Sequence, residues 1–409
     1  MRNTERNHSI GGWKRRSVIA TVAALLWFFS RANAEAKDDY LLVEAKINGQ
    51  PVKLAFDTGA ETTVLFRWAA EKFGLRITNA APDAKPLPGK VAVGATETLN
   101  LTIWTRTIRS SFPVIDIPKG IRAEIGGVVA WSNLRDNIIH IDAGTRQFEF
   151  LDTVPRPAKK WLKFPIVRDR DVLTISLPDN GDGKKYIVLD TGAENRGVAL
   201  RPQKWNEWIA AHPGRARTLE GYYMPAAGLV VEEVSWADKL ALGPLNLTAV
   251  SVEKSNSAED ASYGPEFVAV LGLDALKHLD LIINGNKGLL YARDKGIVIP
   301  PNHNRIGAVF APVALDKDEL LAHVLEGSPA YAGGIRNGDI LLAVDGTDAT
   351  KWRSDTQTNE GSHWERPAGT KTHLKLRRGT NEFETDLILK NLIGPDLKPE
   401  ASESQDSPD

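Results

Sequence analysis

Two short segments of this sequence carry residues that could do chemistry together. Asp57 ends the largely apolar run 52–56, Asp190 ends the run 186–189, and each is followed by Thr-Gly-Ala-Glu. A carboxylate at the end of a buried strand is costly unless it is hydrogen-bonded or shares a proton. If the two segments face each other, their carboxyls would hold one proton between them, a state that can activate water. One Asp-Thr-Gly alone is more often a plain turn, but two copies in matching contexts favour catalysis.

The composition excludes several other kinds of site. The chain has 409 residues, 42% hydrophobic and 25% charged, an ordinary balance for two or three globular domains. It has no cysteine, no His-Glu-x-x-His and no Gly-x-Ser-x-Gly, so we expect no disulfide, no metal and no cofactor. The net charge is -1, and removing residues 1–34, with six basic and one acidic residue, makes it -6. That charge disfavours a nucleic-acid partner.

The N-terminus has the features of a removable signal peptide, residues 1–34. Three basic residues at 14–16 precede the apolar run 17–30, and Ala32-Asn33-Ala34 supplies a small-residue cleavage pattern. The apolar run is short for a membrane span, so we expect none after cleavage. Arg15-Arg16 leaves both general and twin-arginine export open. We expect an exported protein, in a bacterial periplasm or secreted.

The two Asp-Thr-Gly segments belong to a longer internal repeat. Each unit spans about 110 to 140 residues of short strands separated by turn signals, which predicts a small β-barrel. Within the first unit we expect strands on both sides of a turn at 48–49, a helix over 67–73 and a hairpin of 138–141 with 147–150. The matched pairs are Asn48-Gly49 with Asn180-Gly181, Leu99–Thr102 with Leu245–Thr248, Val129–Leu134 with Leu271–Leu276, and Ile139–Asp142 with Leu281–Asn284.

This pattern of strand, Asp-Thr-Gly-Ala, hairpin, and apolar residues before a short helix resembles the retropepsin-like aspartic proteases, over residues 38–295. The resemblance implies a mainly β fold of two tandem barrels that form a pseudo-dimer within one chain. It implies Asp57 and Asp190 as the catalytic dyad and peptides or proteins as substrates. Dyad support would come from Thr58, Gly59, Thr191 and Gly192.

The same resemblance implies two flaps that close over an extended peptide, and it also shows departures. The flap positions, aligned by a Pro-x-x-Gly pattern, are Pro86 with Gly89 and Pro225 with Gly228. In the first unit, Ala130 stands where the family usually has Gly. In the second, Arg196 occupies the place that Thr63 holds in the first, so the two halves differ in charge.

The C-terminal part resembles a bacterial PDZ domain over residues 303–392. The resemblance rests on Gly327-Ser328-Pro329-Ala330, Ala332–Ile335 and Gly338–Leu341. PDZ domains add a peptide strand to a sheet edge and hold the peptide's C-terminus with backbone N–H groups. Here the carboxylate-binding loop would lie at Ile306, Gly307, Ala308, Val309 and Phe310, although an ordinary strand is as good an interpretation of these residues.

The sequence thus predicts an exported aspartic endopeptidase whose PDZ domain folds apart from the barrels and recruits or senses substrate C-termini. One alternative is a non-catalytic peptide-binding scaffold of the cell envelope that uses only the PDZ domain. Another is a dyad assembled between two chains. The expected parts are a signal peptide (1–34), two retropepsin-like domains (38–152 and 163–295), linkers (153–162 and 296–302), a PDZ domain (303–392) and a disordered acidic tail (393–409).

Overall fold

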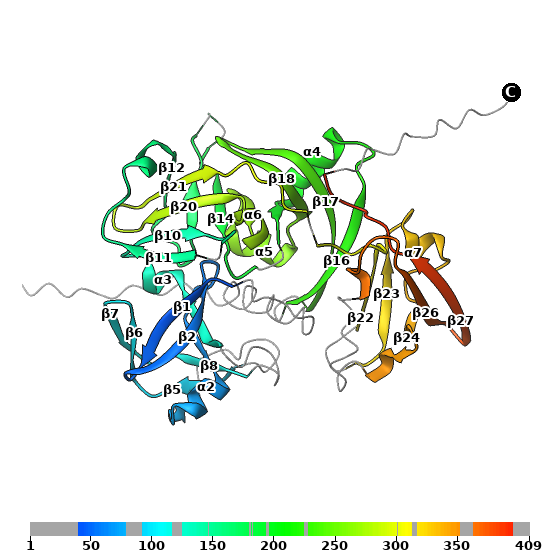
Figure 1. The fold of residues 1–409 in the computed structure, drawn as a ribbon, viewed down its shortest axis with the longest axis horizontal. Helices are drawn as coiled ribbons and strands as arrows, with labels where there is room; N and C mark the ends of the chain where they lie inside the picture. Colours follow the sequence, from blue (N-terminus) through cyan, green and yellow to red (C-terminus); the bar gives the residue numbers. More distant parts are fainter. Residues whose placement is uncertain are drawn as a thin grey trace, which may run out of the picture.

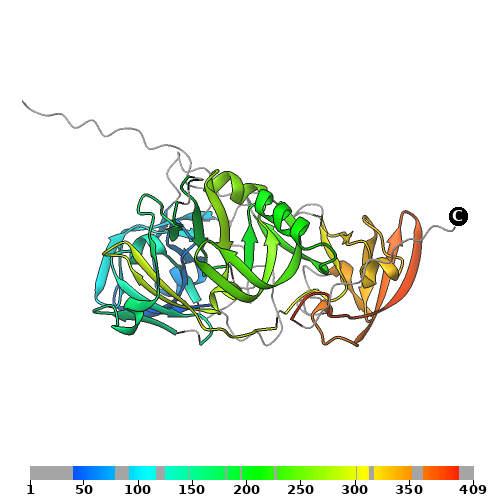
Figure 2. The ribbon, with the colours of Figure 1, turned by 90° about the horizontal axis from the view of Figure 1, so that it is seen from above.

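A computed structural model describes residues 40–78, 92–116, 125–145, 147–179, 181, 183–193, 196–224, 228–300, 302–312, 317–351 and 363–395. The described chain is mainly β, with strands gathered into four sheets. The parts of the chain follow one another along its length, with the C-terminal part at one end (Figures 1 and 2). The expected signal peptide lies outside the described residues. Within the described residues, no helix is both long and apolar enough to span a membrane.

The first half forms a nine-stranded sheet in the order β4-β5-β8-β3-β9-β2-β1-β6-β7. Alternate residues of β1 point into the core, as expected of a strand with one solvated face. The expected hairpin around 48–49 and helix over 67–73 are both present. The elements are β1 (Leu42–Ile47), β2 (Gln50–Asp57), β3 (Val64–Phe66), α2 (Arg67–Lys72), β4 (Ile77–Thr78), β5 (Ala92–Thr96), β6 (Leu99–Ile103), β7 (Arg106–Ser110), β8 (Pro113–Ile115), β9 (Ile125–Ala130) and α3 (Trp131–Leu134).

The second half forms a seven-stranded sheet in the order β13-β14-β19-β15-β18-β17-β16. Its strand pairing repeats that of the first half. The strand before each Asp runs parallel to the strand before a short helix, β2 with β9 and β14 with β19. The elements are β13 (Thr174–Ser176), β14 (Tyr186–Leu189), β15 (Val198–Leu200), α4 (Pro202–Ala211), β16 (Arg217–Met224), β17 (Gly228–Leu242), β18 (Leu245–Lys254), α5 (Ser257–Tyr263), β19 (Phe267–Leu271) and α6 (Leu273–Leu276).

A five-stranded sheet, β11-β10-β20-β21-β12, joins the two halves. β10 of the first half pairs antiparallel with β20 of the second, from Ile138 opposite Asn284 to Asp142 opposite Asp280. One hydrophobic core runs from Leu41 to Ala292 through both halves, so the two halves share their interior. The expected linker 153–162 contains a helical turn and the first residue of β12. The elements are β10 (Ile138–Asp142), β11 (Gln147–Leu151), η2 (Pro157–Lys160), β12 (Leu162–Pro165), β20 (Leu279–Asn284) and β21 (Leu289–Asp294).

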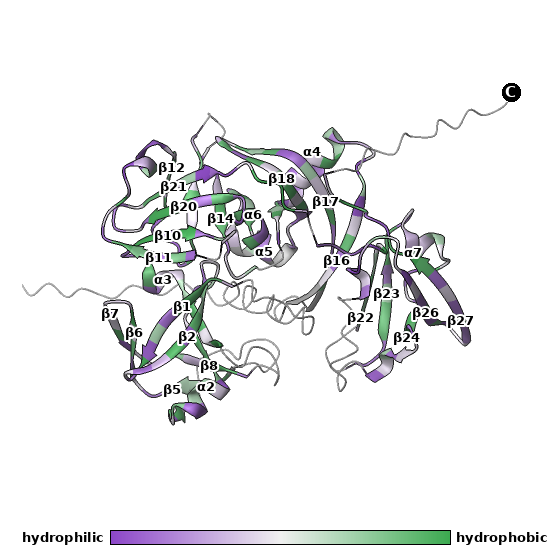
Figure 3. Cartoon of the chain, in the orientation of Figure 1, coloured by the Kyte–Doolittle hydropathy of each residue, from purple (hydrophilic) through white to green (hydrophobic). Residues whose placement is uncertain are grey.

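The C-terminal part has its own sheet, in the order β22-β23-β24-β26-β27, and its own core from Ile306 to Leu389. β23 is largely hydrophobic, whereas the outer strand β27 is largely hydrophilic (Figure 3). The elements are β22 (Ala308–Pro312), β23 (Leu320–Val324), α7 (Pro329–Ala332), β24 (Ile340–Val344), β25 (Thr347–Asp348), η3 (Ala349–Lys351), β26 (Lys371–Arg378) and β27 (Asn381–Ile388).

The start of the expected tail is part of the folded protein. Ile393 is buried and packs with Val234, Trp236 and Ala249 of the second half. The expectation that disorder begins at residue 393 is therefore wrong for its first residues, because an apolar side chain there finds a partner surface that the tail's polar composition concealed. The residues beyond 395 lie outside the described chain.

Candidate active site

The fold brings the two Asp-Thr-Gly segments together within one chain. Asp57 is the last residue of β2, and Asp190 follows β14 directly. Both carboxyl groups are buried, with 0% and 4% of each residue exposed. Each of the two strands pairs in parallel with a fully buried neighbour, β2 with β9 and β14 with β19, which fixes the depth of the Asp at its end. The arrangement with each half paired to a second chain is not the one observed.

The two threonines tie the facing loops by a reciprocal set of buried hydrogen bonds. The Thr58 hydroxyl donates to the Leu189 carbonyl (2.7 Å) and accepts from the Thr191 backbone N–H (3.0 Å). The Thr191 hydroxyl donates to the Phe56 carbonyl (2.7 Å) and accepts from the Thr58 N–H (3.0 Å). Since each bond crosses from one half to the other, these four bonds fix the separation of the two aspartates.

Each glycine makes room for the opposite carboxyl. A Cβ on Gly59 would lie 2.4 Å from Cγ of Asp190, and one on Gly192 would lie 2.4 Å from Cγ of Asp57. Oδ1 of Asp57 accepts from Gly59 N (2.8 Å) and Ala60 N (2.9 Å), and Oδ1 of Asp190 accepts from Gly192 N (2.9 Å). Oδ2 of Asp57 is buried without a hydrogen-bond partner among the described residues. That oxygen is a place for a proton or a bound water.

Burial raises the pKa of both carboxyls. Burial, followed by the charge of Asp190, raises the pKa of Asp57 well above its ordinary value. Burial also raises the pKa of Asp190, to about 6, although the positive charge of Arg196 opposes that rise. Two adjacent carboxyls titrate as a pair, so the proton is shared over a wide pH range and is held more firmly by Asp57.

Arg196 makes the two halves unequal. Its guanidinium is fully buried and donates to the carboxylates of Glu253 and Glu259, with Glu232 3.8 Å away. A buried cation needs such partners, because desolvation costs several kcal/mol per ion. Burial raises the pKa of Glu253 despite the favourable charge of Arg196. The cluster therefore places a buried arginine, paired with glutamates, near Asp190, and the charge of Arg196 opposes the rise in the pKa of that carboxyl.

In the first half, Thr63 occupies the position equivalent to Arg196, and its hydrogen-bond partners are uncharged. The Thr63 hydroxyl accepts from Ala130 N (2.9 Å) and donates to Asn133 Oδ1. In the second half, a Cβ on Gly272 would lie 2.4 Å from Cβ of Arg196, so only glycine fits there. Ala130 is fully buried in the first half, where the smaller Thr63 replaces the arginine. The first half thus differs from the second at both of these positions: it has Ala130 where the second half has Gly272, and Thr63 where the second half has Arg196.

The remaining predicted site residues belong to the two expected flaps and to the C-terminal part. Pro86, Gly89 and Pro225 lie outside the described residues, and Gly228 is the first residue of β17, opposite Met224 of β16. The hairpin β16–β17 therefore exists where the second flap was expected. In the C-terminal part, Ile306 and Gly307 precede β22, and Ala308, Val309 and Phe310 begin it. The strand interpretation holds for the last three residues, and carboxylate binding by this stretch stays a prediction.

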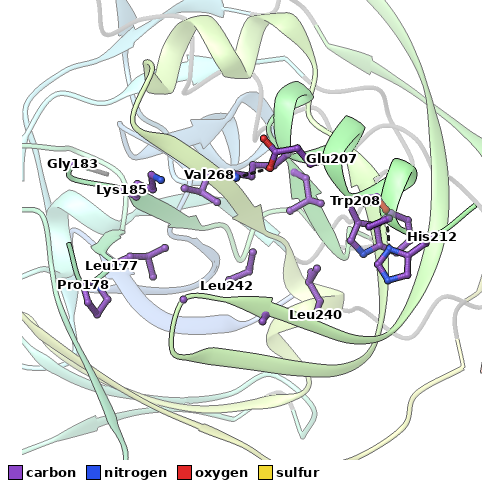
Figure 4. Close-up of a pocket in the computed structure, with 15 residues that line it drawn as sticks. Leu177, Pro178, Gly183, Lys185, Glu207, Trp208, His212, Leu240, Leu242 and Val268 are labelled. Atoms are coloured by element: carbon purple, nitrogen blue, oxygen red, sulfur yellow. Dashed lines mark hydrogen bonds and ion pairs between the residues drawn. The ribbon is translucent and has the colours of Figure 1, made fainter. Parts of the chain in front are cut away.

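A separate cavity of about 400 Å³ lies in the second half, away from the dyad (Figure 4). Its apolar wall includes Leu177, Leu240 and Leu242, and Glu207 of α4 and His212, directly after α4, lie at its side. Over the described chain no group of three or more His, Asp or Glu could hold a metal ion.

Sequence reasoning missed the partners of Arg196 and the contacts of the β16–β17 hairpin. Glu253 lies next to the end of β18, and Glu259 belongs to a capping box with Asn256. Neither position differs in the sequence from that of a surface glutamate. The contacts of β16 with Asn304 also left no signal in the sequence, because they join elements 84 residues apart.

Comparison with known families agrees with this architecture. A sequence model described as aspartyl protease matches residues 43–111, which include Asp57, and one described as PDZ domain matches residues 322–378. A search of curated proteins finds no match. The chain thus contains a retropepsin-like aspartyl protease domain near its N-terminus and a PDZ domain at its C-terminus.

Proposed function

We propose that this protein is an exported aspartic endopeptidase that hydrolyses peptide bonds with the Asp57–Asp190 dyad. One observation carries the proposal: two buried carboxyls face each other across reciprocal threonine bonds, each lying over the other's glycine. Nothing in a purely structural turn would require two buried carboxyls that face each other at the centre of a shared core. A pair that shares one proton is suited to acid–base work on water.

In the proposed reaction, Asp190 is the ionised member and Asp57 carries the proton. Arg196 favours negative charge on Asp190, and Asp57 has the higher pKa. Asp190 removes a proton from a water molecule as its oxygen bonds to the scissile carbonyl carbon. Asp57 donates its proton to the carbonyl oxygen. When the C–N bond breaks, the proton held by Asp190 passes to the leaving nitrogen, and the proton on the gem-diol oxygen returns to Asp57.

The other expected features belong to the same proposal. The basic, apolar and small-residue segments of residues 1–34 support export to a periplasm or the exterior. The PDZ domain supports binding of peptide or protein C-termini, with recruitment or sensing of substrates as its role.

A cleavage assay on purified protein with a pool of labelled peptides tests the enzyme. We expect cleavage that pepstatin inhibits and that Asp57→Asn or Asp190→Asn abolishes, because neither carboxyl works without its partner. Activity per chain should not fall on dilution, and mixing the two inactive variants should restore nothing. Full activity in either variant would refute the dyad, and peptide binding without cleavage would favour the non-catalytic scaffold.

A further inference from the structure

The PDZ domain does not stand apart from the protease halves, contrary to the expectation from its sequence. β22 is the end strand of the PDZ sheet, and β16 of the flap hairpin is the end strand of the second half's sheet. The two end strands contact each other side by side (Figure 1). The contact is close, because a Cβ on Gly221 of β16 would lie 2.4 Å from Cγ1 of Val309.

Asn304 forms hydrogen bonds on both sides of this contact, to β16 and to the loop before β22. Its backbone carbonyl accepts from the Thr218 hydroxyl (2.6 Å) and its backbone N–H donates to Glu220 (3.0 Å), both on β16. Its side-chain oxygen accepts from the N–H groups of Ile306 (3.0 Å) and Gly307 (3.1 Å). Asn304 is 5% exposed. A side-chain oxygen thus occupies the backbone N–H groups that the sequence assigns to a peptide carboxylate.

Both parts of a PDZ peptide site, the strand edge and the carboxylate-binding N–H groups, are therefore in contact with other residues of the same protein. A peptide strand would need the open edge of β22, which faces β16, and a terminal carboxylate would need the N–H groups that Asn304 holds. We propose that the PDZ domain is docked on the second flap through its peptide-binding edge, and that docking of β16 and binding of a free peptide C-terminus exclude each other. This rests on the proposed function only in naming the hairpin a flap.

The packing allows the PDZ domain to move as a unit. Its core is separate from the core of the protease halves. The two ends of the domain are joined to each other, since Leu392 N donates to His303 Nε2 (3.1 Å), and Ile393 anchors the departing chain on Val234 and Trp236. The PDZ domain would therefore undock by rotating about its joined chain ends, and this rotation would separate β22 from β16.

Peptide binding to the full-length Asp57→Asn protein tests the exclusion without depending on catalysis. The probe is a mixture of fluorescein-labelled heptapeptides of random sequence that end in a free Ala, Val, Leu or Phe carboxylate. The same mixture with C-terminal amides is the control. Gly221→Ala drives a methyl group into Val309, and Thr218→Val removes the hydroxyl that donates to the Asn304 carbonyl, so two independent changes on β16 weaken the same contact.

We expect Gly221→Ala to bind the free-acid mixture at least tenfold more tightly than the parent, and Thr218→Val to bind it more tightly as well. Hydrogen exchange at residues 217–221 should rise in Gly221→Ala, and should rise in the parent when the free-acid mixture saturates it. Equal affinity in all three proteins, no binding by any of them, or unchanged exchange on peptide binding would overturn the proposal. None of these outcomes requires cleavage, so they leave the proposed enzyme to its own assay.

Discussion

Replacing Thr58 by valine tests whether the threonine bonds hold the dyad together. Valine keeps the shape and burial of threonine but removes the hydroxyl. Two buried backbone groups then lose their partners, the Leu189 carbonyl (2.7 Å) and the Thr191 N–H (3.0 Å). An unsatisfied buried group costs about 1–3 kcal/mol, so we expect the free energy of unfolding to fall by about 2–6 kcal/mol.

The matched control is Thr58→Ser, which keeps the hydroxyl and loses one methyl group. It should cost no more than about 1 kcal/mol. Urea unfolding followed by tryptophan fluorescence measures both variants. The Thr58→Val, Thr191→Val double variant should be less destabilised than the sum of the single changes, because the two residues share one network. A Thr58→Val protein as stable as Thr58→Ser would refute the view that these bonds join the halves.

Three further outcomes follow from the site. Gly192→Ala should abolish cleavage with the fold retained by circular dichroism, since its Cβ would lie 2.4 Å from Cγ of Asp57. Arg196→Met should lower the free energy of unfolding by about 3–5 kcal/mol in urea, because it leaves buried glutamates unpaired; unchanged stability would contradict the ion cluster. Folding raises the pKa of Asp190 from 3.8 to about 6. The stability that this group contributes is therefore fully present below pH 3.8, and about 3 kcal/mol of it is lost as the pH rises through 6. Melting temperatures from pH 4 to 7 should show that slope, and Asp190→Asn should flatten it.

The sequence by itself determined the mainly β fold and the duplication. These are local features: apolar runs that end in Asp-Thr-Gly, turns at 48–49 and repeated strands carry their own signals. The family comparison agrees for the first Asp-Thr-Gly unit and for the PDZ domain. The repeat singled out Asp57 and Asp190 as equivalent residues, but it left open whether they face each other within one chain or between two.

Only the tertiary structure decided how the parts depend on one another. The sheet that joins the halves pairs residues about 140 positions apart, and strand edges carry no sequence code for a distant partner. The ion cluster of Arg196 required three chain segments to meet in space. The docking of β16 on β22 depends on a glycine, a valine and the backbone of Asn304, none of which is unusual in the sequence. The local sequence pattern determines which segments form strands, whereas burial and edge pairing determine which other elements those strands contact.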